Sequence, residues 1–261
     1  MGTKLYPSKA SPHPESRYTL KAADVRRGLM DSLKALKTDK IDLFYLHGPD
    51  REVPFEETLR EVNKLHNEGL FNRFGISNFL SWEVAAMCQI CEQNGWIKPT
   101  VYQSIYNAIH RNIEAEFFPC LRYYGISLYS FQPLASGFLT SHYQRNQTEF
   151  EPGSRFDTST FLGKATTARY WNNAYFDTLD VMRPVMKKHG LTEAEYAMRW
   201  LSHHSEMKLE AGDAVIIGAS NIEHAKENLV DLEKGPLPED VVEAMNEAWM
   251  KVKAVSPKYW H

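Results

Sequence analysis

The stretch "IDLFYLHGPD" at residues 41–50 decides how the rest of the chain is read. Its apolar run is short and rich in aromatic and aliphatic side chains, which is typical of a buried strand rather than a helix. Gly-Pro-Asp then marks a turn. His47 ends the run, and in a barrel the loops that follow the strands form the active-site face. The stretch therefore predicts a strand that delivers a histidine to a functional site.

Short apolar runs of this kind recur along the chain and alternate with amphipathic stretches. The further expected strands are "GTKLY" at the start and residues 71–77, 100–106, 126–134 and 214–220. Residues 22–37 and 55–69 carry apolar side chains at helical spacing. Further helix signals are a capping box of Thr192 and Glu195, helix stops at Gly125 and Gly190, and an N1 proline at Pro238.

Strand and helix in alternation predict an α/β fold with a parallel sheet and helices outside it. A length of 261 residues suits one large domain, so a single domain spanning residues 1–261 is expected. The strand-like runs amount to about six βα units, whereas a (β/α)₈ TIM-type barrel needs eight. Two readings stay open at this point: a barrel that lacks two units at its front, or another open sheet.

Composition excludes several classes of protein. The net charge of -3 and a pI of about 6.4 give no nucleic-acid or membrane-surface footprint. No apolar run has the length of a membrane helix, and the N-terminus lacks the apolar core of a signal peptide, so a cytoplasmic protein is expected. Cys88 and Cys91 form a C-x-x-C inside a helical pattern. Without a second ligand pair they are interpreted as buried thiols, and no metal site is predicted.

One long segment, from about Ser141 to Asn173, shows no regular pattern and is rich in Gly, Thr, Asn, Arg and aromatic residues. Loops of this length in a compact domain are usually functional or mobile. The segment is therefore expected to be irregular and to lie near the active-site face, although a disordered surface insertion is the alternative. Its aromatic residues argue against simple disorder.

Five motifs in order carry a resemblance to a known family: "IDLFYLH", "FGISNF", "VYQSIYN", "FQPLASGFLT" and "VIIGASNIEHAKEN". Together they resemble the aldo-keto reductases. The pairing of "LFYLHGPD" with "NGWIKPTVYQSIYNAIHR", and the tail "PKYWH", resemble the aflatoxin-aldehyde reductase branch. The resemblance covers nearly the whole chain from Lys4 onward. It implies a (β/α)₈ barrel, NADP(H) as cofactor and reduction of aldehydes or ketones.

The family's active site is a tetrad of Asp, Tyr, Lys and His. By resemblance, Lys4 matches the lysine and His47 the histidine, while the first two βα units, which carry the aspartate and the tyrosine, are absent. The chain is thus expected to begin at the family's third strand and to be catalytically impaired, because general acid catalysis is typically worth about 10²- to 10⁴-fold. Tyr6, two residues beyond Lys4, and His47 itself are the candidate replacement acids.

The resemblance also assigns the cofactor site. Ser77, Asn78 and Gln103 are expected to hold the nicotinamide carboxamide, and Phe131 to stack on its ring. The residues expected around the pyrophosphate and the adenosine half are Pro133, Leu134, Ser136, Gly218, Ser220, Asn221, His224 and Asn228. The turn that contains Gly218, Ser220 and Asn221 lacks the basic residue that many relatives carry there. A glutamine or arginine is usual in the family at the position of His224. Both departures weaken the case for strict NADPH preference.

The candidate substrate residues are Tyr6, Arg155, Arg169 and Trp171. An arginine among them would bind the carboxylate of an acidic aldehyde in bidentate fashion. The expected partner is a small aldehyde or ketone, with a homodimer, or another pairing, that covers the open seam of an incomplete barrel. Other functions remain open. They are an NADP(H)-binding pseudoenzyme, a non-redox enzyme using Lys4 or His47, and a reductase whose gene start or splicing yields this shorter chain.

Overall fold

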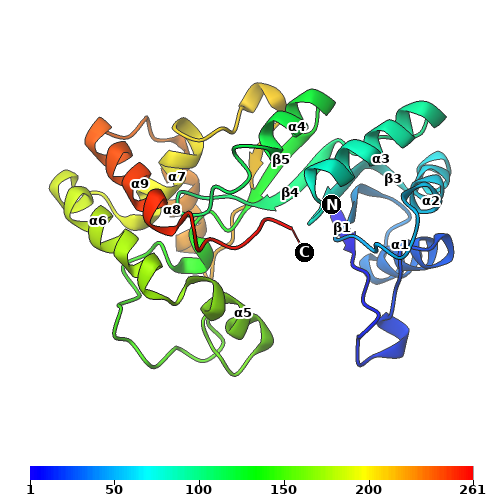
Figure 1. Ribbon diagram of the computed structural model, residues 1–261. Coiled ribbons are helices and arrows are strands. Elements are labelled where there is room, and N and C mark those ends of the chain that lie inside the picture. Colours follow the sequence, from blue (N-terminus) through cyan, green and yellow to red (C-terminus); the bar gives the residue numbers. More distant parts are fainter. Residues whose placement is uncertain (261) are drawn as a thin grey trace. The chain divides into compact units, whose positions relative to one another are not determined.

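The computed structural model describes residues 1–260. Its strands form one sheet in chain order, β1-β2-β3-β4-β5-β6 (Figure 1). The pairs β1–β2, β2–β3 and β3–β4 are parallel. The six-stranded sheet with helices around it is consistent with a barrel of the (β/α)₈ type that carries six strands. The strands are Gly2–Leu5 (β1), Ile41–Leu46 (β2), Phe71–Ser77 (β3), Val101–Ile105 (β4), Ser127–Phe131 (β5) and Ala214–Val215 (β6).

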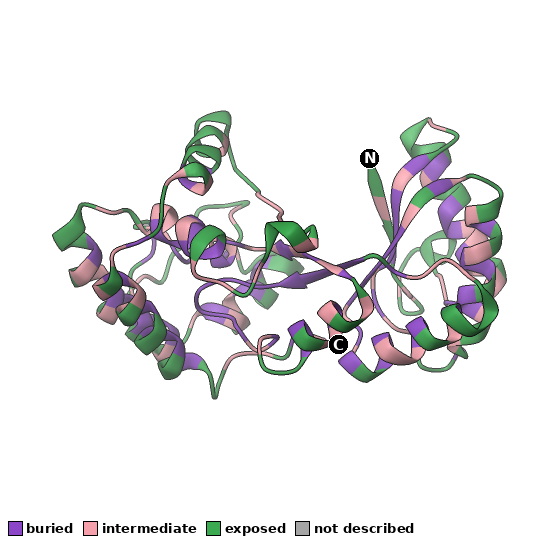
Figure 2. Cartoon of the chain, turned by 90° about the horizontal axis from the view of Figure 1, so that it is seen from above, coloured by how far each residue is buried: buried purple, intermediate pink, exposed green. Residues whose placement is uncertain are grey.

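Helices follow most strands, as the alternating pattern predicts. The α-helices are Ala22–Leu36 (α1), Phe55–Asn67 (α2), Ser81–Asn94 (α3), Phe117–Tyr124 (α4), Phe161–Tyr170 (α5), Asn173–His189 (α6), Glu193–His203 (α7), Ile222–Glu233 (α8) and Glu239–Val252 (α9). Short 3₁₀ turns are Pro14–Ser16 (η1), Ala135–Gly137 (η2) and Leu209–Ala211 (η3). Figure 2 shows most helices with buried residues on one side and exposed residues on the other, the pattern of amphipathic helices.

The described chain divides into two compact units. The N-terminal unit holds residues 1–104 and 115–129 together with the chain end from Tyr259, and the C-terminal unit holds residues 105–114 and 130–258. The boundary falls within β4 and within β5, so each of these strands has its first residues in one unit and its last in the other.

Two strands of the N-terminal unit are buried on both faces over most of their length, whereas β1 is mostly exposed. The strands β2 and β3 are almost wholly buried, which is characteristic of parallel strands covered by helices. The helix α1 lies close against β1, since a Cβ added at Gly28 would stand 2.4 Å from Cδ1 of Leu5. The hydroxyl of Thr3 on β1 donates to the hydroxyl of Ser32 on α1 at 3.3 Å. These contacts fix the strand that carries Lys4.

The C-terminal unit is organised around α6 packed on α9 and α7 packed on α8. The buried side chain of Arg111 joins several of its parts: it donates to Asn246 Oδ1 at 2.7 Å and lies 4.2 Å from the ring centroid of Trp200. Burial lowers the pKa of this guanidinium to about 10. The residue follows β4 in the "YNAIHR" motif, so this motif packs the end of β4 against the last helix.

Most elements agree with the sequence, and the differences have local causes. The expected stops at Gly125 and Gly190 are confirmed, because both residues adopt the left-handed conformation after a helix. The hydroxyl of Thr192 accepts from the Glu195 amide at 3.1 Å, but the Glu195 carboxylate pairs with Arg199 instead of closing the capping box.

Three expectations on element boundaries were wrong in detail. Pro238 precedes α9 as its N-cap and is not its first residue. The last run, residues 214–220, forms a strand only at Ala214–Val215, because Gly218 and the residues after it already belong to an exposed turn. The segment 141–173 is not wholly irregular, since it contains α5.

The interpretation of the C-x-x-C is confirmed. Cys88 and Cys91 lie fully buried on α3, and burial raises the pKa of both thiols to about 12. Within residues 1–260, no group of histidine, cysteine or acidic side chains is arranged to hold a metal ion. No helix of the described chain is long and apolar enough to cross a membrane.

Candidate functional site

Lys4 lies on β1 and His47 directly follows the adjacent strand β2 in the N-terminal unit. The register pairs Lys4 with Tyr45, and the lysine Nζ lies 5.5 Å from the centroid of the Tyr45 ring. Lys4 is exposed in part, while burial of the remainder lowers the pKa of its ammonium group. Because alternate residues of a strand share a face, His47 follows Tyr45 on the same side of the sheet. The structure therefore places Lys4 on one strand and His47 at the end of the strand beside it.

Tyr6 lies directly against His47. The two rings meet edge to face, with centroids 5.5 Å apart and planes at 77°. The ring of Tyr6 also covers Gly48, where an added Cβ would stand 2.9 Å from Cε2 of the tyrosine. Tyr6 keeps 46% of its surface exposed. A phenol that touches the histidine and reaches solvent is well placed to supply or relay a proton.

Ser77, Asn78 and Gln103 lie close together, Ser77 and Asn78 at the end of β3 and Gln103 within β4. The Ser77 hydroxyl donates to the main-chain oxygen of Gln103 at 2.8 Å, and Asn78 Nδ2 lies 3.3 Å from the same hydroxyl. Asn78 also donates to the main-chain oxygen of His47 at 2.7 Å. Its backbone is left-handed, with φ of 65°, a conformation that asparagine tolerates better than most residues. The carboxamide-binding candidates are thus fastened to the strand end that carries His47.

Tyr45 belongs to this group although sequence reasoning did not select it. Its side chain is buried, and burial is the main cause that raises the pKa of its hydroxyl. The ring lies over Gly75, where an added Cβ would stand 2.5 Å from two ring carbons. The two-residue spacing before His47 was the available signal, since it places Tyr45 on the same face of the strand.

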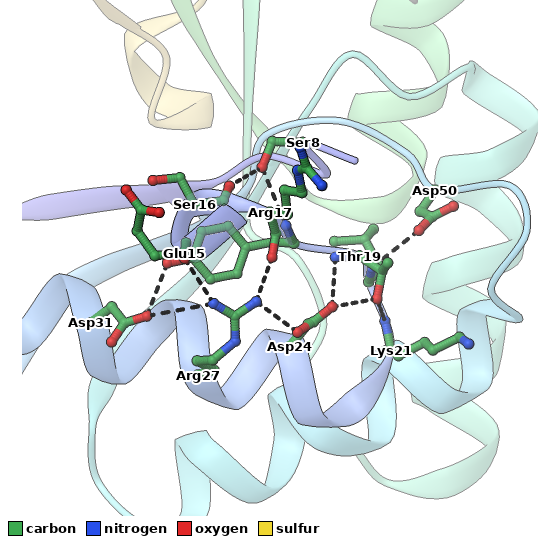
Figure 3. Close-up of polar contacts among 12 residues, drawn as sticks. Ser8, Glu15, Ser16, Arg17, Thr19, Lys21, Asp24, Arg27, Asp31 and Asp50 are labelled. Atoms are coloured by element: carbon green, nitrogen blue, oxygen red, sulfur yellow. Dashed lines mark hydrogen bonds and ion pairs between the residues drawn. The ribbon is translucent and has the colours of Figure 1, made fainter. Parts of the chain in front are cut away.

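The connection from β1 to α1 is held in place by Arg27 of α1, as Figure 3 shows. Its guanidinium donates to the main-chain oxygen of Glu15 at 3.0 Å, to that of Arg17, and to Asp24 Oδ1 at 2.9 Å. The same group lies 4.2 Å from the centroid of the Tyr18 ring. One side chain therefore fixes several turns of a connection that has no strand of its own.

An open hollow of about 360 Å³ adjoins Lys4 and Tyr6. Tyr18, Asp31 and Ser32 contribute to its wall, and the Tyr18 hydroxyl donates to Asp31 Oδ2 at 2.9 Å. Lys4 and Tyr6 therefore both line an open, water-accessible hollow.

Asp50, from the "GPD" that follows His47, anchors the same connection from the other side. It accepts from Lys9 Nζ at 2.8 Å and from the Leu20 amide at 3.2 Å. Burial by itself raises the pKa of this carboxyl, but the hydrogen bonds outweigh it and hold the pKa below its usual range. The turn signal in the opening stretch thus also has a structural role.

In the C-terminal unit, the loop after β5 has an unusual backbone. Gln132, Ala135 and Ser136 are not glycines, yet all have φ between 49° and 61°. The left-handed conformation costs such residues about 1–2 kcal/mol each, so the surrounding contacts must hold it. Phe131 and Leu134 are half-buried, and Pro133 is buried. This is the loop that the resemblance places over the pyrophosphate.

The turn into α8 presents the other predicted phosphate contacts. Gly218, Ser220, Asn221 and His224 are all exposed there. Asn221 caps the helix by accepting from the His224 amide at 2.8 Å, and the Ser220 hydroxyl lies 3.0 Å from His224 Nδ1. The start of a helix favours a negatively charged group, because free amides and the helix dipole point at it.

Asn228 is placed differently from these residues, because it is buried on α8 with 3% of its surface exposed. The nearby basic residue Lys226 pairs with Glu223 at 3.0 Å. The turn into α8 therefore exposes hydroxyl, amide and imidazole groups at the start of a helix.

The substrate candidates of the C-terminal unit do not form one group. Arg155 is exposed in the segment before α5. Arg169, near the end of α5, donates to Gln132 Oε1 at 3.3 Å. Trp171 packs edge-on against Phe150 with ring centroids 4.7 Å apart. Arg169 therefore lies beside the loop after β5, whereas Trp171 is part of an aromatic cluster.

Comparison with known proteins supports the family that the sequence motifs indicate. The model of the Aldo/keto reductase family matches residues 2–250. The chain is 55% identical to "Aldo-keto reductase pigE" of Monascus ruber, over 99% of this chain and 77% of that protein. It is 50% identical to "Aldo-keto reductase MYCFIDRAFT_156381" of Pseudocercospora fijiensis, over 100% of this chain and 86% of that protein. It is 41% identical to "Aflatoxin B1 aldehyde reductase member 2" of Mus musculus, over 95% of this chain and 69% of that protein.

Proposed function

Because the chain belongs to the aldo/keto reductase family and is an oxidoreductase by that membership, we propose that it reduces small aldehydes or ketones to alcohols with NADPH. The observation that carries the proposal is the fastening of Ser77, Asn78 and Gln103 to the strand end of His47. These residues would hold a carboxamide beside a hydrogen-bond donor. That is the arrangement that a hydride transfer to a carbonyl carbon requires.

Bound NADPH would supply the hydride, and the side chains of this chain would manage the charge on the carbonyl oxygen. As hydride arrives, the oxygen becomes an alkoxide and needs hydrogen-bond donors or a proton. His47 would orient the carbonyl by donating a hydrogen bond. The Lys4 ammonium, whose pKa is lowered by burial, would stabilise the developing negative charge. Tyr6, edge-on to His47, is the proposed proton source, and His47 itself is the second candidate.

We propose that turnover by this polypeptide is slow. The proposal is supported by the resemblance, which assigns Lys4 and His47 to the family's tetrad and assigns none of residues 1–261 to its aspartate and tyrosine. A general acid that is poorly matched typically lowers the rate by about 10²- to 10⁴-fold. Hydride transfer itself does not depend on that acid, because donors at the oxygen still lower the barrier.

NADP(H) is the proposed cofactor. Besides the carboxamide group, Phe131 would stack on the nicotinamide, and the residues proposed for the remaining contacts are Pro133, Leu134, Ser136, Gly218, Ser220, Asn221, His224 and Asn228. Supporting this are the left-handed backbone of the loop after β5 and the exposed start of α8. With Lys226 paired to Glu223, we expect only a modest preference for NADPH over NADH.

We also propose that Arg155, Arg169 and Trp171 shape the substrate pocket and favour an acidic aldehyde. A homodimer in the cytoplasm, with one domain over residues 1–261, completes the proposal, and no nucleic acid or membrane is expected to take part. Light scattering during gel filtration tests the dimer, for which a mass near twice 30.1 kDa is expected.

The missing tyrosine counterpart favours one alternative, a protein that binds NADP(H) without reducing a carbonyl. The deciding experiment measures NADPH oxidation with a reactive aromatic aldehyde for the wild type, Lys4→Met, His47→Ala and Tyr6→Phe. We expect slow turnover that falls at least tenfold in the first two variants and several-fold in the third. Turnover that none of the three substitutions changes would exclude this mechanism, while tight NADPH binding without turnover would support the alternative.

A further inference from the structure

Gln132 is the point at which three segments of the C-terminal unit meet. It follows β5 directly and opens the loop with left-handed backbone at Gln132, Ala135 and Ser136. A non-glycine residue keeps this conformation only where its surroundings determine it.

Each of the two oxygen atoms of Gln132, one in the main chain and one in the side chain, accepts two hydrogen bonds. Its main-chain oxygen accepts from Asn107 Nδ2 at 2.9 Å and from the Ala135 amide at 2.9 Å. Its side-chain oxygen accepts from the Tyr170 hydroxyl at 3.0 Å and from Arg169 Nη1 at 3.3 Å. Asn107 belongs to the loop after β4, and the last two donors belong to the end of α5.

The contact with α5 is firmly seated. Tyr170 is fully buried, with its ring stacked at 6.0 Å and 18° on Phe138 and edge-on to Tyr175 at 5.3 Å. Burial keeps the pKa of its hydroxyl high, so the phenol stays protonated and donates. A buried donor of this kind costs free energy if its acceptor is lost, so the position of Gln132 and that of α5 depend on each other.

We propose that Gln132 is a positioning residue that couples the segment ending in α5, residues 141–172, to the shape of the cofactor loop. The proposal rests on the proposed function, because it assigns the loop after β5 to NADPH. When α5 is seated, its two donors hold Gln132 and with it the turn at Ala135 and Ser136. Coupling is reciprocal, so a cofactor bound on the loop also protects α5 from opening.

Three substitutions at Gln132 separate the side-chain role from the backbone role. Gln132→Met keeps the size of the side chain and removes the acceptor. Gln132→Glu keeps an acceptor oxygen for Tyr170 and adds a charge that suits Arg169. Gln132→Gly removes the side chain but relieves the left-handed backbone.

The expected results differ for each variant. In Gln132→Met and Gln132→Gly, the Kd of NADPH rises roughly 5- to 50-fold, and KM for NADPH rises more than kcat falls. Hydrogen exchange of the α5 amides becomes faster in both variants without ligand. Gln132→Glu retains wild-type affinity and exchange. Tyr170→Phe weakens NADPH binding in the wild type but adds little in Gln132→Met, because the two groups act through one hydrogen bond.

Each other outcome overturns the inference. Wild-type affinity and α5 exchange in Gln132→Met would show that the hydrogen bond couples nothing, and full affinity in Gln132→Gly would assign the effect to the backbone alone. If the wild type binds no NADPH, the proposed function fails by itself. Hydrogen exchange without ligand then still decides: unchanged α5 protection in Gln132→Met refutes the coupling, and faster exchange supports it.

Discussion

Single residues around the predicted catalytic pair show how tightly this part of the N-terminal unit is packed. The Tyr45 ring lies across Gly75 and beside Lys4, and only a residue without a side chain fits beneath it. Lys4 and His47 were selected from the motifs alone, and the structure places Lys4 on β1 and His47 just after the adjacent strand β2. The role of Gly75 does not follow from the sequence, because it depends on the strand register that brings Tyr45 opposite to it.

Gly75→Ala is therefore expected to lower the free energy of unfolding by about 1–3 kcal/mol, the usual cost of overpacking a filled core. The added methyl group would lie 2.5 Å from two carbons of a buried ring. Gly235→Ala is the matched control, because nothing lies within 4 Å of a Cβ there. Urea unfolding of both variants checks this; equal stabilities would mean that Tyr45 moves aside freely.

A second residue prediction concerns His110 in the C-terminal unit. Neither of its ring nitrogens has a hydrogen-bond partner within residues 1–260. Burial, with a smaller contribution from the charge of Arg169, lowers its pKa from 6.5 to about 3. The unfolded chain therefore takes up a proton as the pH falls through 6.5, whereas the folded chain does so only near pH 3.

Between these two values, His110 should make the wild type lose about 1.4 kcal/mol of stability per pH unit. His110→Leu removes this contribution, so the stability difference between variant and wild type should shift in favour of the variant as the pH falls from 7 to 4. Chemical unfolding at several pH values measures it. A difference that stays constant with pH would show that His110 is protonated equally in both states.

At the scale of elements, helix ends and strand positions follow from the sequence, whereas short or weakly patterned elements do not. The strand at residues 71–77 was predicted with its bounds, because its apolar run is clear. The helix α5 was missed, because its buried side is formed by Gly163, Thr166 and Tyr170, while Phe161 and Leu162 are exposed. A helix whose apolar residues face solvent gives no amphipathic signal.

Substitutions at the C-terminal caps of two helices should change the stability of the protein in opposite directions. The residue that caps the end of α1 is Lys37, with φ of 52°, whereas the residue that caps the end of α3 is Gly95, with φ of 64°. Lys37→Gly should raise the unfolding free energy by about 1 kcal/mol, and Gly95→Ala should lower it by a similar amount. Thermal unfolding of the two variants checks this. The account of the caps fails if both substitutions change stability in the same direction.

At the scale of the whole molecule, the family was inferred from the order of the motifs, and the proposed chemistry was inferred from the family. The motif-based resemblance is confirmed by the family match over residues 2–250 and by relatives of the aflatoxin-aldehyde reductase branch. The interlocking of Asn78 with His47 and the junction at Gln132 were beyond sequence reasoning, because each joins side chains to main-chain atoms of another strand or loop. Periodicity and motif spacing carry no information on such contacts.

A protein that binds NADPH in its folded state only is stabilised by the cofactor, by about 2.7 kcal/mol at a hundred times Kd. We therefore expect NADPH to raise the melting temperature by several degrees, and NADH to do so somewhat less at equal concentration. Asn78→Ala should reduce both shifts, because its amide fastens the carboxamide residues to the strand end of His47. The concentration used, 1 mM NADPH, is roughly a hundred times a Kd of about 10 μM. Identical melting curves with and without NADPH at this concentration would count against the cofactor assignment.

The most direct test of the central claim traces the hydride. The protein is incubated with an aromatic aldehyde and NADPH that carries deuterium at both C4 positions, and the alcohol is analysed by mass spectrometry. Reduction by this chain predicts one deuterium on the alcohol carbon, formed slowly by the wild type and at least tenfold more slowly by His47→Ala. Bound cofactor with no labelled alcohol after long incubation would contradict the account and leave a binding protein in place of a reductase.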